Sequence, residues 1–428
     1  MFKKLYDHPL YLYPNFRNFF IGDVLVAVAE RYFAITFAWW IISQDGENGK
    51  WLGLLMAVEA IPILCLSPFV GPIIDRYNKK WCMLIGATAQ LFFVTIIWLL
   101  MQGDALQFTY LVILSFCMSC FVPQFEDSIS ASVGSLVDEK HLSQATTIQS
   151  TSIEFSNIFA AVISASMIAA FGIAHAVLFN LALYVVGVLF LFSIKTELLR
   201  PVEENDSEED DEDEESGESS NRYLKDLKKG LKYIASNRPL YLYAIVYALE
   251  TFFTVPIFIL IPMLVKGVLH ETINWVAVFE TSLSIGSVLT AVVLSFKSEF
   301  KRFYPTYAVV AFCMGAFMIA LGFATNGYLM AGLIFFMGGL FATMMAMSFM
   351  MFQYVVPQEL KGRFFGVMST IAAGMAPLSY MTVGLLSDIW STEAVLILDG
   401  IGAALLGIYV LTIPRLRESI EVVEDVDY

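Results

Sequence analysis

The sequence contains few of the side chains on which most enzymes and metalloproteins depend. Only 15% of its 428 residues are charged, and it has four histidines and five cysteines. An ordinary soluble domain is about one quarter charged. We recognise no Ser/His/Asp set, no cluster of metal ligands and no phosphate-binding loop. We therefore expect no catalytic residue, no metal site and no cofactor, and we predict that the chain is not an enzyme.

Long apolar stretches dominate the sequence instead. The chain is 58% hydrophobic and has 36 phenylalanines. Stretches of about twenty apolar residues, each enough to cross a hydrocarbon core of about 30 Å, recur along it. The expected spans are 18–43, 51–73, 81–101, 107–129, 144–171, 174–194, 240–265, 273–296, 304–324, 328–353, 364–388 and 394–414. The sequence thus predicts an all-α membrane protein with twelve transmembrane helices in two six-helix bundles.

Lysine and arginine predict the orientation of these helices. Nearly all of the 25 basic residues fall in segments that share one side of the membrane with both termini. The exceptions are Lys50, Lys266 and Arg31, the last of which lies within a span. Because basic residues collect on the cytoplasmic side, we expect both termini in the cytoplasm and the protein in the cell membrane of a bacterium.

A strongly acidic tract separates the two groups of six spans. Residues 203–218 supply 12 carboxylates and account for most of the net charge of −15. Such a segment cannot bury apolar surface, and we expect it to be disordered. The predicted organisation is a first bundle at 1–194, a cytoplasmic linker at 195–238 that ends in an amphipathic helix, a second bundle at 239–414 and an acidic tail at 415–428.

Acidic residues occupy corresponding places in the two halves. Glu30 and Glu250 each lie near the middle of the first span of their half. Glu59 and Glu280 follow them at nearly equal distances, in the second span of each half. A duplicated six-helix unit would leave this pattern. Parallel repeats with a binding site at their interface are typical of alternating-access transporters.

The loop between the second and third spans carries a motif. It reads GPIIDRYNKK (71–80) and resembles the G-x-x-x-D-R-x-x-R/K-K signature of the major facilitator superfamily. The resemblance implies a gating loop made of Gly71, Asp75, Arg76, Lys79 and Lys80. In such a loop the glycine lets two helices approach closely, Asp75 and Arg76 stabilise the outward-facing state, and the basic residues meet lipid phosphate.

Two further stretches resemble the Mef-type macrolide exporters and related drug–proton antiporters. They are FVPQFEDSISASVGSLVDEKHLSQATTIQS (121–150) and VPQELKGRFFGVMSTIAAGMAPLSYMTVGLLSD (356–388). This resemblance implies export driven by inward proton movement. The chain departs from the pattern in two places, since its fourth span has no arginine and the loop after the eighth span has lost the second copy of the signature.

Three mid-span carboxyl groups are the main candidates for binding cargo or protons: Glu30, Glu154 and Glu250. A charged group near the bilayer centre costs roughly 2.5–3.5 kcal/mol, which indicates that these acids have a use. A carboxyl group in a low-dielectric cavity holds its proton more firmly than in water. It can therefore take up a proton on one side of the membrane and release it on the other.

Other ionisable groups keep two interpretations. Glu30 and Arg31 either form structural ion pairs or take part in coupling and substrate binding. Glu59 and Glu280, in the outer halves of their spans, are either gate residues or interfacial acids. Asp23 lies toward the cytoplasmic end of the first span, and we interpret it as solvated.

These observations predict a monomeric secondary transporter that exchanges protons for an amphipathic small molecule, as in drug efflux. Its partners would be that substrate, protons and the lipid bilayer, with no nucleic acid. Three alternatives stay open. They are an exporter of an endogenous siderophore or peptide antibiotic, a lysolipid flippase, and a membrane scaffold or sensor whose acidic tract recruits a partner.

Overall fold

The computed structural model describes residues 8–44, 48–199, 229, 231–232, 234–296, 303–356 and 360–412. Nearly all of these residues are helical, and no strand occurs among them. Twelve helical segments within the described ranges are long and apolar enough to cross a membrane. The predicted all-α architecture with twelve spans is therefore confirmed. The acidic tract and the acidic tail lie outside the described residues, as does most of the expected amphipathic helix at 221–237.

The chain divides into two compact units. Unit 1 comprises residues 1–40 and 58–221, and unit 2 comprises residues 41–57 and 222–428. The helix α4 (Gly49–Arg76) therefore begins in unit 2 and ends in unit 1. The domain limits expected from the sequence, at 194 and 239, stay a prediction.

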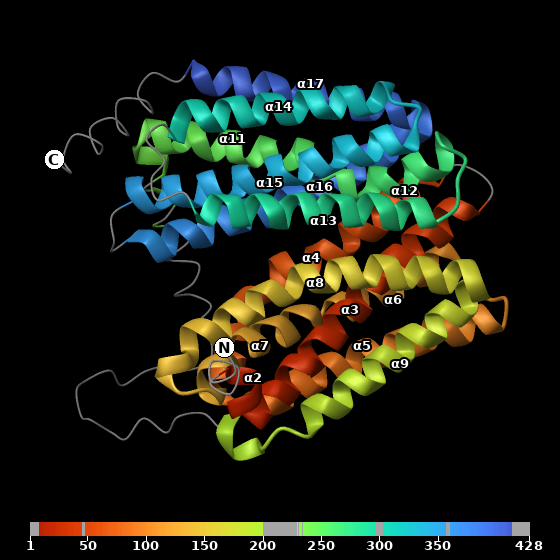
Figure 1. The fold of residues 1–428 in the computed structure, drawn as a ribbon, viewed down its shortest axis with the longest axis vertical. Coiled ribbons are helices and arrows are strands. Elements are labelled where there is room, and N and C mark those ends of the chain that lie inside the picture. The colour runs from red at the N-terminus through yellow and green to blue at the C-terminus, as the bar shows by residue number, and fades with distance from the viewer. Residues whose placement is uncertain are drawn as a thin grey trace. The chain divides into compact units, whose positions relative to one another are not determined.

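Unit 1 is built from the first group of spans. Its α5 packs against α7 and α9 (Figure 1). Besides most of α4, its elements are α2 (Pro9–Leu12), α3 (Pro14–Ser43, whose last residues group with unit 2), α5 (Lys79–Gln102), α6 (Phe108–Ser119), α7 (Val122–Leu136), α8 (Glu139–Phe171), α9 (Ile173–Phe192) and the 3₁₀ turn η1 (Thr196–Leu199).

Unit 2 is built from the second group of spans. In it α14 lies alongside α17, and α13 lies alongside α15 (Figure 1). Its helices are α11 (Arg238–Thr254), α12 (Ile257–Gly267), α13 (Asn274–Ser295), α14 (Phe303–Phe323), α15 (Gly327–Val355), α16 (Lys361–Ile389) and α17 (Thr392–Leu411).

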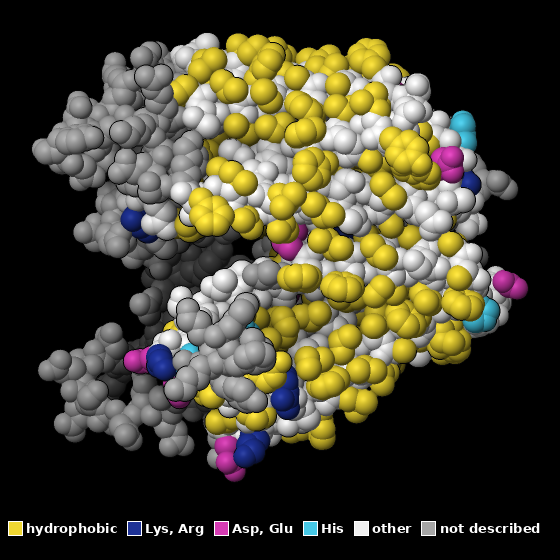
Figure 2. Space-filling view, in the orientation of Figure 1, with side chains coloured by type: hydrophobic (Ala, Val, Ile, Leu, Met, Phe, Trp, Pro, Cys, Tyr) yellow, Lys and Arg dark blue, Asp and Glu magenta, His cyan; other side chains and the backbone are white. Residues whose placement is uncertain are grey.

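The helices expose apolar side chains along their length. Phe296 is 85% exposed, Phe323 73% and Val293 67%. Hydrophobic side chains cover much of the visible face, while most of the charged ones lie toward the left and right edges of the view (Figure 2). A water-soluble protein rarely exposes such large apolar areas. A helix can face hydrocarbon because it satisfies its backbone hydrogen bonds within itself.

The seventh span is broken, where the sequence predicted one continuous helix over 240–265. The first part, α11, ends at Thr254, and α12 begins at Ile257 after Pro256. In a continuous α-helix the carbonyl of Phe252 would accept a hydrogen bond from the backbone N–H of residue 256. Pro256 has no backbone N–H, so this hydrogen bond is not made. The hydroxyl of Ser379 in α16 donates a hydrogen bond to that carbonyl. The break is thus compensated by a neighbouring helix, as an unpaired backbone group in a membrane requires.

Candidate functional site

Asp23 is a buried acid of unit 1 with polar partners on another helix. It lies in α3 and is only 6% exposed. Its Oδ2 accepts hydrogen bonds from Nε2 of Gln149 at 3.0 Å and from Oγ of Ser152 at 3.4 Å, both in α8. The interpretation of Asp23 as a solvated acid was wrong, because α8 covers it. Only the pairing of α3 with α8 could have revealed this.

Glu30, two turns further along α3, lies at the edge of a second polar group. Its Oε1 is buried and has no hydrogen-bond partner among the described residues. The side chain lies beside Gln90 of α5, whose Oε1 accepts a hydrogen bond from the Tyr184 hydroxyl of α9 at 3.1 Å. Nδ2 of Asn180 in α9 donates to the carbonyl of Ala29 at 2.7 Å. Amide and hydroxyl groups of α5 and α9 therefore lie close to Ala29 and Glu30 of α3.

The remaining candidates of unit 1, Glu59, Glu154 and Arg31, are all half-buried. Glu59 in α4 lies beside Ser115 of α6, and its buried Oε1 has no partner among the described residues. Glu154 in α8 is half-buried and lies beside Asn157 of the same helix. Arg31 is half-buried in α3, next to Glu30 in the sequence. The roles proposed for these residues stay predictions.

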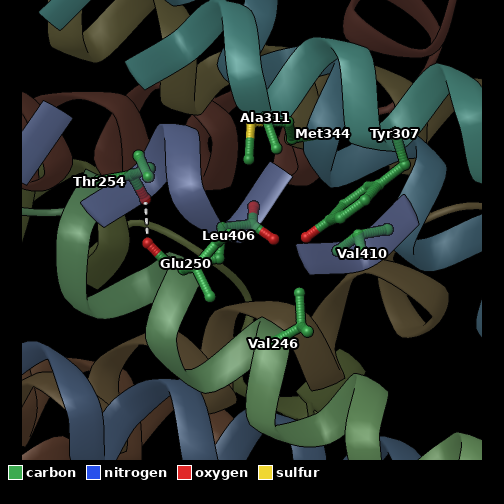
Figure 3. A pocket seen from close by; sticks show the side chains of 9 residues that line it. Val246, Glu250, Thr254, Tyr307, Ala311, Met344, Leu406 and Val410 are labelled. Atoms are coloured by element: carbon green, nitrogen blue, oxygen red, sulfur yellow. Dashed lines mark hydrogen bonds between the residues drawn. The ribbon is translucent and has the colours of Figure 1, made fainter. Parts of the chain in front are cut away.

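Glu250 lines a narrow pocket within unit 2. The side chain is 6% exposed, and its Oε2 has no hydrogen-bond partner among the described residues. The pocket is lined by residues of α11, α14, α15 and α17 and has room for about one water molecule. The hydroxyl of Tyr307 from α14 points toward the Glu250 carboxyl group in Figure 3, and it too lacks a partner among the described residues.

Unit 2 contains two more buried acids. Glu280, a candidate from the sequence, lies in α13 and is 5% exposed. Asp399, in the middle of α17, is 4% exposed, and its Oδ2 has no partner among the described residues. The sequence interpretation missed Asp399, although its position in the middle of a span was a usable signal. It also missed Gln90, which is fully buried in α5.

The comparison with protein families decides the class of the chain. A model of the Major Facilitator Superfamily matches residues 19–380. The chain belongs to this superfamily. It is thus an integral membrane transporter rather than an enzyme, as the sequence motif at 71–80 predicted.

Two curated relatives belong to the same class of transporter. The chain is 23% identical to the uncharacterized MFS-type transporter YfiS of Bacillus subtilis (strain 168) over 384 residues, which cover 86% of this chain and 85% of YfiS. It is 27% identical to the multidrug efflux pump Tap of Mycolicibacterium fortuitum over 146 residues, which cover 34% of this chain and 35% of Tap.

Solved structures share the fold. The nucleoside transporter NupG has a TM-score of 0.71 at 12% identity, over 93% of this chain and 98% of that one. A bacterial homologue of the iron transporter ferroportin, in its inward-facing state, has a TM-score of 0.70 at 13% identity, over 93% of this chain and 98% of that one. At these identities the likeness shows the fold alone.

The superfamily signature at 71–80 differs from the expectation in the place of a lysine. Nζ of Lys80 is not directed to lipid phosphate, since it donates to the carbonyl of Ile194 at 2.6 Å beyond the end of α9, and Lys80 is only 6% exposed. A cation there complements the negative end of a helix dipole. A Cβ added to Gly71 would meet no described atom within 4 Å, and the gating role of this glycine stays a prediction. Nζ of Lys79 donates to the carbonyl of Ala131 at 2.9 Å.

Proposed function

We propose that this superfamily member is a secondary transporter that exports amphipathic small molecules in exchange for protons. The observation that carries the proposal is a set of carboxyl oxygens, in Glu30, Glu59 and Glu250, that are buried without a hydrogen-bond partner among the described residues. An ionised carboxylate in such surroundings is costly unless it is paired. Each group therefore favours a bound proton in this conformation and would release it in one that admits water.

Export of drug-like cargo is the finer part of the proposal. Its support is the resemblance of 121–150 and 356–388 to Mef-type exporters and the partial similarity to the multidrug efflux pump Tap. A cationic or zwitterionic cargo suits a transporter with candidate acids in both units. Glu30, Glu59 and Glu154 are half-buried whereas Glu250 is enclosed, so the acids of unit 1 are better placed to meet a cation.

The proposal is tested with purified protein in liposomes that have an acidic interior. Tetraphenylphosphonium and ethidium are added outside, and their accumulation is followed with and without the pH gradient. We expect the gradient to drive accumulation of at least one of the two cations, because protons leave as the cation enters. Glu30→Gln, Glu154→Gln and Glu250→Gln should each lower accumulation to the level seen without a gradient, since a carboxamide cannot carry a proton.

Glu271→Gln is the matched control, because it removes an exposed carboxyl group between α12 and α13. It should transport as the unchanged protein does. Gradient-driven accumulation that persists in both Glu154→Gln and Glu250→Gln would contradict proton coupling through these acids. Accumulation of neither cation, with transport of a siderophore or a lysolipid instead, would favour one of the other cargo classes.

A further inference from the structure

We propose that Glu250 and Tyr307 enclose one water molecule and form a proton-binding site inside unit 2 that cargo does not enter. The inference rests on the proposed function. Within that function, it states that Glu250 binds the proton and does not contact the cargo. Competition between cargo and proton for the same carboxyl group would then be excluded at this position.

The size of the pocket separates the two roles. It has room for about one water molecule, whereas an amphipathic cargo molecule is many times larger. Its walls come from four helices of the same unit: α11 supplies Glu250, α14 supplies Tyr307 and Ala311, α15 supplies Met344, and α17 supplies Leu406. A proton, carried by water, is the one species in the proposed exchange that fits.

The polar groups of the pocket fit a water molecule. The carboxyl group of Glu250 and the hydroxyl of Tyr307 point toward one another in Figure 3. Neither Oε2 of Glu250 nor the Tyr307 hydroxyl has a hydrogen-bond partner among the described residues. A buried polar group without a partner costs about 1–3 kcal/mol. One water can bond both groups at once, as buried waters commonly do.

The groups that surround Glu250 leave it without a described cation. From α11 itself, Tyr243 and Tyr247 lie nearby, and the Tyr243 hydroxyl donates to Oγ of Ser348 in α15 at 2.9 Å. From α14 comes Tyr307, and in α17 Asp399 lies one turn before Ala403, which lines the pocket. None of these groups is basic, so a proton rather than an ion pair neutralises the carboxyl group.

Glu250 lies close to the break between α11 and α12. It lies on the last turn of α11, one turn before the break at Pro256, and its own carbonyl accepts a hydrogen bond from Thr254 Oγ1 at 2.8 Å. Loss of the proton would place an unpaired charge in a mostly apolar pocket between four packed helices. This charge would lie close to the joint between α11 and α12.

The test is an infrared difference titration of the purified protein in lipid, with neither cargo nor gradient present. Carboxylic acid groups that bind protons give a C=O band. Glu250→Gln should lose one component of this band, and Glu271→Gln should keep it. Tyr307→Phe and Ala311→Val should both shift that component, because the first removes a hydrogen-bonding group and the second fills the space for water. A component that survives in Glu250→Gln, or that is unmoved in both pocket variants, would overturn the proposal.

Binding of tetraphenylphosphonium separates the proton role from a cargo role. We expect its dissociation constant in Glu250→Gln to stay within about twofold of the unchanged protein. A weakening of about tenfold or more would place cargo against Glu250 and overturn the inference. If Glu250→Gln does not fold, the band shifts in Tyr307→Phe and Ala311→Val still decide the matter. If the band behaves as expected but the gradient drives neither cation, the proposed export function fails and the proton site stands.

Discussion

The acids of the two units lie in different surroundings. In unit 1, Asp23 accepts two hydrogen bonds from α8, and Glu30 lies beside an amide that is itself bonded to Tyr184. In unit 2, Glu250 and Asp399 each have a carboxyl oxygen without a described partner, as Glu30 does, but the polar lining of the Glu250 pocket is limited to Thr254 and Tyr307 and includes no amide side chain. The duplicated positions of Glu30 and Glu250 therefore carry the same residue in unlike chemistry. Hydrogen-bond donors in a polar network can stabilise an ionised carboxylate. An isolated buried carboxyl group has no such donors, so it either stays protonated or moves to a place that water reaches.

Asn180 and Asp399 show the same difference at a single pair of positions. Each is the eighth residue of the last helix of its half, α9 and α17. Nδ2 of Asn180 donates to the carbonyl of Ala29. An aspartate can act as a donor only when it is protonated. In unit 2, Oδ2 of Asp399 has no partner among the described residues, so the corresponding position does not make this contact.

The largest effect is expected at the close helix contacts of the two units. A Cβ on Gly286 in α13 would collide with the backbone carbonyl of Phe335 in α15. A Cβ on Gly22 in α3 would meet Cγ of Leu191 at 2.7 Å, and a side chain can move. Gly286→Ala should lower the free energy of unfolding by about 3 kcal/mol or more and Gly22→Ala by about 1 kcal/mol, measured by denaturation in detergent.

Gly332→Ala is the control for this pair, because a Cβ there would meet no described atom within 4 Å. It should leave stability unchanged or raise it slightly, since alanine favours a helix over glycine. An equal loss of unfolding free energy in Gly286→Ala and Gly22→Ala would contradict this expectation. It would mean that the backbones of α13 and α15 move apart at no greater cost than a change of the Leu191 side chain.

The twelve spans could be predicted from the sequence because their signal is local. A run of about twenty apolar residues is sufficient to indicate a membrane helix. Pro256 is a local signal for the break of the seventh span. The hydrogen bond from Ser379 that compensates the break has no local signal, because Ser379 lies far away in the sequence. The same limit explains Lys80, whose partner at Ile194 is brought to it only by the packing of α5 against α9.

The next effect in size is expected from exchanging the residue types at 180 and 399. Asn180→Asp removes a donor to the Ala29 carbonyl and should lower the free energy of unfolding by about 2 kcal/mol near neutral pH. The loss should shrink as the pH falls, because a protonated aspartic acid can donate that hydrogen bond again. Unfolding curves at several pH values measure it.

Asp399→Asn is the reciprocal change. It should make stability less dependent on pH and leave it equal or higher at alkaline pH, because the folded protein no longer needs to hold a proton at 399. An Asn180→Asp loss that is the same at every pH would contradict the donor role of Asn180.

The acids themselves show how far a site can be predicted. Glu30, Glu59, Glu154, Glu250 and Glu280 stood out because they interrupt apolar runs. Their neighbours did not, since Gln90, Tyr184 and Tyr307 look like ordinary span residues until the helices are packed together. Asp399 was overlooked although the same rule applies to it. Burial and hydrogen bonding, which decide the chemistry of an acid, are properties of the assembled unit.

The smallest effect is expected where a charge meets a helix end. The carboxylate of Asp388 in α16 accepts hydrogen bonds from the backbone N–H groups of Gly49 at 2.7 Å and Lys50 at 3.1 Å, at the start of α4 within unit 2. In unit 1, buried Lys80 donates to a carbonyl beyond the end of α9.

Asp388→Asn keeps only one of the two oxygens that accept these hydrogen bonds and should cost about 0.5–1 kcal/mol, with a smaller cost in high salt. Lys80→Met should cost about 1–2 kcal/mol and respond little to salt, because the carbonyl that it leaves is buried. Denaturation at low and high ionic strength distinguishes the two, and a strong salt dependence for Lys80→Met would show that water reaches this lysine.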